Sequence, residues 1–184
     1  MIVLTGPSGA GKGTMVQELL ARIPRLRLAV SATTRARRPG EVDGVHYWFI
    51  TDEEFDRRLA EGDFLEYHVF PWGQRSGTLL SELARIADEG DIPLLELELN
   101  GSLAVKEKVP GALTIFIDAP LEELERRLRE RATESAGEIE DRIALAAKQR
   151  RLAGLFDEVV ENDDRERAAE QCVELVEREL AACR

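Results

Sequence analysis

The chain has 184 residues, enough to bury one sizeable α/β core, and its 25 basic and 36 acidic residues give a net charge of −11. Such an acidic surface disfavours nonspecific binding to nucleic acid or to an anionic membrane, so we expect neither as a partner. The sequence opens on a strand pattern without a signal peptide and holds no apolar run of membrane-spanning length, so we expect a cytoplasmic protein.

The first predicted element is a buried strand, MIVLT, and the glycine-rich stretch GPSGAGK follows it at residues 6–12. This stretch fits the phosphate-loop pattern G-x-x-x-x-G-K, in which glycines bring backbone N–H groups close to phosphate oxygens. Apolar residues then recur at helical spacing up to Pro24, so the positive end of a helix points at the same anion. The alternative is a glycine turn with a solvated lysine, but strand, loop and helix stand in the required order. We therefore predict a nucleoside triphosphate site at Gly9, Ala10, Gly11, Lys12, Gly13 and Thr14.

Gly13 departs from the usual pattern, which places serine or threonine after the lysine so that its hydroxyl meets Mg²⁺. Here the hydroxyl comes one residue later, on Thr14. Mg²⁺ keeps much of its hydration and can be held through water and nucleotide phosphates, so we predict Thr14 as a metal-site residue. The GKGT form resembles the phosphate loop of adenylate kinases and their relatives.

Strand and helix patterns alternate along most of the remaining chain. Strands are predicted at residues 26–30, 45–50, 63–70, 93–99, 113–117 and 158–162. Helices are predicted at residues 51–62, 79–87, 121–131 and 142–152 and from residue 164 onward, with an interruption at residues 132–140. In the helix at 51–62, Thr51 and Glu54 form a capping box, and Phe55 and Leu59 are expected to be buried. This order predicts a parallel sheet flanked by helices, with an inserted lobe at residues 31–78 that breaks the alternation.

The cysteines and histidines carry no predicted chemistry. Cys172 and Cys183 stand eleven residues apart in the last predicted helix, roughly 16 Å, which is too far for a disulfide within one helix. Both are therefore expected as free thiols. His46 and His68 are too scattered for a metal cluster, and we expect them at strand edges.

The predicted lobe holds a second set of polar residues. Arg35 and Arg38 lie three residues apart on one loop, and guanidinium groups grip phosphate through paired N–H donors. Tyr47 can add a phenolic hydrogen bond to the same group. A solvated basic loop is the alternative, but it does not account for the order of Pro39, Gly40 and Tyr47.

The block SATTRARRPGEVDGVHYWF at residues 31–49, continuing to EGDFLEY at residues 61–67, resembles the substrate-binding region of guanylate kinases. With the phosphate loop before it and RLRERATES, DR and VVENDD after it, the resemblance covers nearly the whole chain. It implies the P-loop nucleoside monophosphate kinase fold in one kinase domain. That domain would comprise a core at residues 1–30 and 79–184, a monophosphate-binding lobe at 31–78 and a lid at about 131–142. The implied activity transfers the γ-phosphate of ATP to GMP or dGMP, with Mg²⁺, giving GDP and ADP.

The resemblance also implies roles for residues on the acceptor side. Arg35, Arg38 and Tyr47 match the positions that bind the GMP phosphate. Glu66 matches a base-selecting position, because a carboxylate accepts from the ring N–H and the amine of guanine but repels the ring nitrogen acceptor of adenine. A plain strand-edge charge is the alternative for Glu66. Ser31 and Thr78 match positions near the guanine carbonyl and could donate to it.

On the donor side, Lys12, Arg131 and Arg142 match the residues that place positive charge around the transferred phosphate. The other arginines of the basic helix are assigned to i, i+4 pairs such as Glu122–Arg126 and Glu123–Arg127. Asn162 matches a position near the adenine of ATP.

Several positions depart from the family pattern. Ser76 stands where a second phosphate-binding tyrosine is usual, in a loop about one residue longer than expected, and Ala132 stands where the lid often has glycine. The two aspartates of a family strand motif read as Glu96 and Glu98, so Glu96 is predicted near the metal through water and Glu98 near the guanine amine. Trp72 is either an aromatic plug at the rim of the lobe or a wall that reshapes the acceptor pocket.

Three functions therefore remain open. The first is a guanylate kinase. The second, a close variant, is a kinase for another nucleoside monophosphate or a nucleotide analogue. The third is a guanylate-kinase-like module that binds proteins and has lost catalysis. The presence of the phosphate-loop lysine and of the arginines that match catalytic positions favours an enzyme. The expected partners are the nucleotides ATP and GMP, and the oligomeric state stays open.

Overall fold

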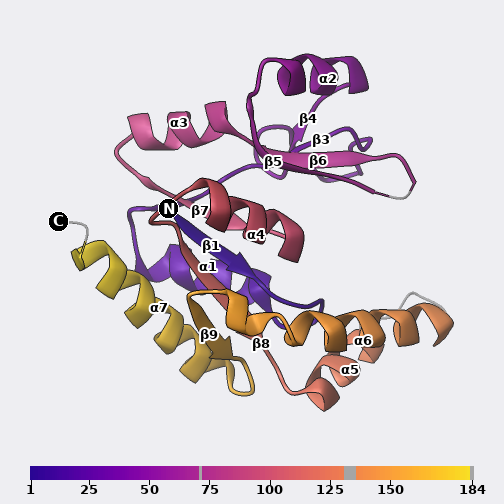
Figure 1. The fold of residues 1–184 in the computed structure, drawn as a ribbon, viewed down its shortest axis with the longest axis vertical. Coiled ribbons are helices and arrows are strands. Elements are labelled where there is room, and N and C mark those ends of the chain that lie inside the picture. Colours follow the sequence, from indigo (N-terminus) through magenta and orange to yellow (C-terminus); the bar gives the residue numbers. More distant parts are fainter. Residues whose placement is uncertain (71, 131–135, 183–184) are drawn as a thin grey trace. The chain divides into compact units, whose positions relative to one another are not determined.

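A computed structural model describes residues 1–70, 72–130 and 136–182 of the chain (Figure 1). The chain forms two compact units. Unit 1 comprises Met1–Leu26 and Leu94–Arg184, and unit 2 comprises Arg27–Pro93. The predicted lobe of residues 31–78 lies within unit 2, which also holds the helix that follows the lobe.

A five-stranded sheet with the strand order β2-β7-β1-β8-β9 forms the centre of the fold. Its strands are Leu26–Leu28 (β2), Ile92–Glu96 (β7), Ile2–Thr5 (β1), Leu113–Asp118 (β8) and Glu158–Glu161 (β9). β1 pairs in parallel with β7 and β8, and β8 pairs in parallel with β9. The apolar run of β1 is buried along its whole length, as expected for a central strand of a parallel sheet with both faces covered.

Helices flank this sheet and confirm the predicted α/β class. They are Lys12–Arg22 (α1), Leu99–Lys108 (α4), Leu121–Glu130 (α5), Ala136–Arg150 (α6) and Arg165–Ala182 (α7), with a short 3-10 turn at Ala153–Leu155 (η1). α1 packs against β1 and α7, and α7 also contacts β8 and β9. α4 contacts β1 and β8, while α5 and α6 pack against each other (Figure 1). The sheet edge at the carboxyl end of β1 is therefore where the chain turns into the N-terminus of α1.

Unit 2 contains a four-stranded sheet with the order β4-β3-β6-β5 and two helices. The elements are Ala32–Thr33 (β3), Trp48–Phe49 (β4), Asp52–Ala60 (α2), Phe64–Val69 (β5), Arg75–Leu79 (β6) and Leu80–Asp88 (α3). β5 and β6 form an antiparallel hairpin, and Phe55 of α2 packs in a cluster with Ala32, Phe64 and Leu79. The hydroxyl of Thr51 accepts from the backbone N–H of Glu54 at 3.1 Å, so the predicted N-terminus of α2 is confirmed.

Three predictions for unit 2 are wrong. The strand predicted at 45–50 shrinks to Trp48–Phe49, because the preceding residues form a hydrogen-bonded loop in which the backbone N–H of Val42 donates to His46 Nδ1. His46 thus lies in a loop and not at a strand edge. Leu59 is 36 % exposed, since α2 makes its core contact through Phe55.

Three further elements, α4, β6 and α6, differ from the prediction. The strand predicted at 93–99 ends at Glu96, and the chain then forms α4, which the alternation of leucine and glutamate concealed. β6 was missed because its sequence, RSGTL, combines polar residues with a glycine. Helix α6 begins at Ala136, so the interruption predicted at 132–140 is wrong from that residue onward.

The last helix, α7, buries one face that includes Ala168, Ala169 and Cys172. Burial raises the pKa of the Cys172 thiol to about 12, so this cysteine is an inert core residue. Cys183 lies outside the described residues. None of the described helices is long and apolar enough to cross a membrane.

Candidate active site

The phosphate loop connects β1 to α1 and depends on glycine at two points of close approach. Gly6 has a φ of +142°, and a Cβ on it would lie 2.1 Å from the backbone oxygen of Ile117 in β8. Gly11 has a φ of +92°, and its Cβ would lie 2.4 Å from Nδ2 of Asn162. A larger residue at position 6 would force the loop away from β8, and one at position 11 would be strained by the positive φ and would displace the Asn162 amide.

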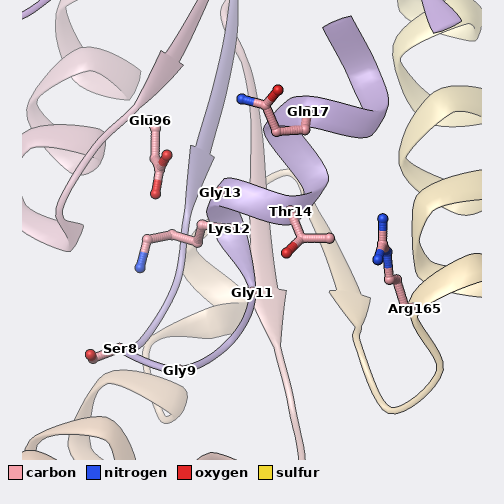
Figure 2. A pocket seen from close by; sticks show the side chains of 9 residues that line it. All are labelled: Ser8, Gly9, Gly11, Lys12, Gly13, Thr14, Gln17, Glu96 and Arg165. Carbon is pink, nitrogen blue, oxygen red and sulfur yellow. The ribbon is translucent and has the colours of Figure 1, made fainter. Parts of the chain in front are cut away.

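This loop forms the wall of a pocket of about 500 Å³ (Figure 2). The pocket is lined by Ser8, Gly9, Gly11, Lys12, Gly13, Thr14, Gln17, Glu96 and Arg165. Five of the six phosphate-loop residues predicted to bind a nucleoside triphosphate therefore line one pocket, together with both residues predicted near a metal. The sixth, Ala10, also belongs to the loop but is fully buried. The N-terminus of α1 opens on this space, which makes it suitable for an anion.

In this structure the Lys12 ammonium group is hydrogen-bonded to the backbone of the phosphate loop. Its Nζ donates to the backbone oxygens of Gly6 at 2.8 Å and Pro7 at 3.2 Å. The Lys12 and Glu96 side chains lie on the same side of the first turn of α1 (Figure 2). Partial desolvation raises the pKa of the Glu96 carboxyl, while the nearby Lys12 charge lowers it and Glu98 raises it further.

The oxygen donors in this pocket suit Mg²⁺. Thr14 offers a hydroxyl and Glu96 a carboxylate, which are hard ligands. Among the described residues no group of three His, Cys, Asp or Glu side chains could form an all-protein metal site. A cation that keeps several waters and binds chiefly through nucleotide phosphates needs no such group.

Gly13 is not imposed by the backbone or by crowding. A Cβ at this position would meet Glu96 Oε2 at 4.0 Å, which is an ordinary contact distance. A serine would therefore fit in the first turn of α1, and nothing in the structure explains the glycine.

Three residues that line the pocket were not identified from the sequence. Ser8 lies within the loop, Gln17 lies on α1, and Arg165 lies on the first turn of α7 (Figure 2). Arg165 Nη2 donates to Glu18 Oε1 at 2.7 Å. Its position directly after the VVENDD stretch was the one available signal.

Asn162 lies at the end of β9 and is only 3 % exposed. Its Nδ2 donates to the backbone oxygen of Ala10 at 2.7 Å, so the side chain lies against the phosphate loop. The amide predicted near adenine is thus engaged with the loop in this structure.

The two arginines predicted to place charge around the transferred phosphate, Arg131 and Arg142, differ in what the structure describes, and Arg126 was predicted to form a surface ion pair. Arg142 lies on α6 with an exposed side chain. Arg131, like Ala132, lies outside the described residues. Arg126 pairs with Glu123 and Glu130, not with Glu122 as predicted, because side chains three residues apart also face each other on a helix.

In unit 2, the predicted acceptor residues Arg35 and Tyr47 come together. The Arg35 guanidinium lies 5.4 Å from the centre of the Tyr47 ring, and its Nη2 donates to Glu41 Oε1 at 2.6 Å. Glu41 Oε2 also accepts from the backbone N–H of Arg38 at 2.7 Å. These contacts, above all the Arg35 guanidinium, hold the pKa of the Glu41 carboxyl at about 2. Glu41 was not singled out from the sequence, although it lies in the same loop shortly after Arg38.

Glu66 is a buried carboxylate, although β5 is an edge strand of the unit 2 sheet. It is 8 % exposed, and its Oε1 accepts from the backbone N–H of Thr78 at 3.0 Å and from the Thr78 hydroxyl at 2.8 Å. The Thr78 proton predicted for a guanine carbonyl is therefore donated to Glu66 here. Gly77 permits this pairing of β5 and β6, since a Cβ on it would lie 2.6 Å from the backbone oxygen of Glu66.

The remaining predicted residues are placed as follows. The backbone oxygen of Ser31 accepts from Trp48 at 2.9 Å. The hydroxyl of Ser76 donates to the backbone oxygen of Ala32 at 2.9 Å. Trp72 stacks on Phe70 with ring centres 5.1 Å apart and is 68 % exposed. In unit 1, Glu98 is the exposed N-cap residue of α4.

A glycine-rich loop that connects the central strand of a parallel sheet to the N-terminus of a helix, with a lysine at its end, defines an α/β protein of the P-loop class. The chain belongs to the guanylate kinase family, because the family model described as guanylate kinase matches residues 1–179.

Individual relatives agree with this membership. The chain is 45 % identical to a guanylate kinase from Rubrobacter xylanophilus, over 98 % of this chain and 95 % of that protein. It is 41 % identical to a guanylate kinase from Symbiobacterium thermophilum, over 98 % of this chain and 86 % of that protein. A crystal structure of guanylate kinase from Anaplasma phagocytophilum matches with a TM-score of 0.75 and 29 % identity, over 97 % of this chain and 85 % of that one.

Proposed function

We propose that the chain is a guanylate kinase that transfers the γ-phosphate of ATP to GMP or dGMP, giving ADP and GDP or dGDP. The observation that carries the proposal is that one chain of this family holds both a phosphate-loop pocket and a separate guanidinium and carboxylate set. The first suits the phosphates of ATP, and the second suits a phosphate and a guanine base.

On the donor side, backbone N–H groups and the N-terminus of α1 bind the phosphates of ATP. Lys12 exchanges its bonds to the Gly6 and Pro7 oxygens for bonds to the outer phosphates. Arg131 and Arg142 add positive charge around the transferred group. Mg²⁺, near Thr14 and Glu96, supplies further neutralisation of the phosphate charge when bound. Phosphoryl transfer needs little more from the protein than positioned reactants and positive charge.

On the acceptor side, Arg35, Arg38 and Tyr47 bind the phosphate of GMP. Glu41 orients the Arg35 guanidinium over the Tyr47 ring, so the donors are held ready before the nucleotide arrives. Glu66 accepts from the ring N–H and the amine of guanine, Thr78 fixes its orientation, and Ser31 and Glu98 complete the contacts to the base.

The direct test is ADP release from ATP and Mg²⁺ with each of a panel of ribonucleoside and deoxyribonucleoside monophosphates. We expect turnover with GMP and dGMP and little with AMP, CMP or UMP. Turnover with a different acceptor would contradict the choice of GMP, and no turnover with any acceptor would contradict the enzyme and favour a binding module.

Ser76→Tyr should lower the KM for GMP about tenfold or more with a smaller effect on the KM for ATP. A tyrosine at this position would add one hydrogen bond to the acceptor phosphate, and bonds to charged groups contribute about 1.5–3 kcal/mol. The serine hydroxyl is shorter and bonds the Ala32 oxygen instead. The measurement is the KM for each substrate at saturation of the other.

Ser81→Tyr, on α3 of the same unit, is a matched control that should leave both constants unchanged. A Ser76→Tyr variant with unchanged or weaker GMP binding would contradict the assigned role of this position. A native enzyme that prefers a larger acceptor would contradict it as well, since tyrosine would then be excluded to make room.

A further inference from the structure

We propose that Arg127 is a positioning residue that holds the phosphate loop in its ATP-binding shape from behind. This inference rests on the proposed use of that loop for ATP. Arg127 lies on α5, far from the loop in sequence, yet its Nη1 donates to the backbone oxygens of Gly9 at 3.3 Å and Ala10 at 3.4 Å. Its Nη2 donates to the backbone oxygen of Asn162 at 3.0 Å.

A fourth hydrogen bond, to Glu123, holds the Arg127 side chain in place on α5. Its Nε donates to Glu123 Oε1 at 2.7 Å, one turn earlier on α5. The three nitrogens of one guanidinium therefore connect the phosphate loop, the end of β9 and α5. The rigid, planar fork of arginine can make such a connection, whereas the single ammonium of lysine cannot.

Asn162 completes the contact with the loop. The Ala10 oxygen accepts from Asn162 Nδ2 at 2.7 Å as well as from Arg127. The N–H of a trans peptide points opposite to its carbonyl, so a carbonyl of Ala10 held by these two donors turns the N–H of Gly11 the other way. Gly11 lines the pocket. The two side chains thus orient a backbone donor toward the bound phosphates.

The need for such support increases when ATP binds. In this structure Lys12 bonds the Gly6 and Pro7 oxygens and so stabilises the loop from within. Those bonds break once Lys12 turns to the phosphates. Gly9 and Gly11, both with positive φ, make the loop backbone intrinsically adaptable. The bonds from Arg127 and Asn162 reach the loop from behind the pocket and are retained.

The test compares Arg127→Ala with Arg126→Ala by measuring the Kd for ATP with Mg²⁺, and the Kd for GMP, by calorimetry. Arg126 is a matched control, because it also lies on α5 and bonds Glu123, while its other partner is Glu130 and not the loop. We expect Arg127→Ala to raise the Kd for ATP about tenfold or more, as for the loss of charge-assisted hydrogen bonds. Arg126→Ala should change it less than about twofold. Neither should change the Kd for GMP, whose proposed ligands lie mainly in unit 2.

A second variant covers the case in which Arg127→Ala does not fold. Arg127→Lys keeps the charge but offers one donor site, and it should raise the Kd for ATP by an intermediate factor. An Arg127 variant that is folded and binds ATP as the native protein does would overturn the positioning role. Equal losses in the Arg126 and Arg127 variants, or equal losses of ATP and GMP affinity, would overturn it too, since they would indicate a general effect on α5 or on the fold. A native protein that does not bind ATP would overturn the proposed function, and the positioning role with it.

Discussion

Lys12→Ala should lower kcat by at least about a hundredfold, the scale seen when one preorganised donor to a developing charge is removed. The charge on the transferred phosphoryl group spreads over its oxygens in the transition state, and Lys12 is the lysine that lines the pocket. The measurement is kcat at saturating ATP, GMP and Mg²⁺.

Lys12→Met provides the matched variant for this test. It keeps most of the aliphatic side chain and removes only the charge and its donors to Gly6 and Pro7. Both variants should keep the thermal unfolding midpoint within a few degrees, because Lys12 lies at the edge of the pocket and not in the core. An unchanged kcat in either folded variant would exclude the proposed role of the phosphate loop.

Glu66→Gln should raise the KM for GMP by about a hundredfold, as expected for the loss of two hydrogen bonds to a charged acceptor. Thr78 already donates two hydrogen bonds to one oxygen of the carboxylate. A glutamine has a single acceptor oxygen, so its NH₂ group must face either the donors of Thr78 or the donors of guanine. In either orientation the NH₂ group faces one pair of N–H or O–H donors and forms no hydrogen bond with them. The preference for GMP over AMP should therefore fall.

The comparison for this variant is Glu61→Gln, since Glu61 is an exposed carboxylate of unit 2 that pairs with Arg57. It should leave both the KM for GMP and the ratio of GMP to AMP turnover unchanged. If Glu66→Gln retained the native ratio while staying folded, Glu66 would not select the base. The KM for ATP should be native in both variants.

The phosphate loop was predictable because its information is local. The glycines, the lysine and the following helix are contiguous, and their spacing alone specifies a turn that brings backbone donors to an anion. The same holds for Arg35 and Tyr47, which share one short segment and come within 5.4 Å of each other. The buried state of Glu66 was less certain, since it depends on pairing with Thr78 across a hairpin whose second strand the sequence did not indicate.

The residues that were missed act over long sequence separations. Arg127 was interpreted as one member of an i, i+4 pair, and that pair with Glu123 does exist. Its bonds to Gly9 and Ala10, however, span more than a hundred residues and follow from the docking of α5 beside the loop. Arg165 likewise lines the pocket only because α7 packs against α1. No periodicity within one segment carries such information.

The elements were missed for a different reason. Between β7 and β8 the alternating leucines and glutamates extended the strand pattern, although the chain turns into α4 after Glu98. Strand identity there is decided by pairing with β1, which ends at Glu96. Tertiary pairing thus overrides a local pattern that fits a strand equally well.

The most direct test of the central claim follows the labelled phosphate itself. The native protein is incubated with Mg²⁺, GMP and ATP labelled with ³²P in its γ position, and the products are separated by chromatography. Transfer of the label to GDP, dependent on GMP and absent with AMP in its place, is the predicted result. Label that stays in ATP, or that appears only as inorganic phosphate while GMP is bound, would contradict the claim that this protein is a kinase for GMP.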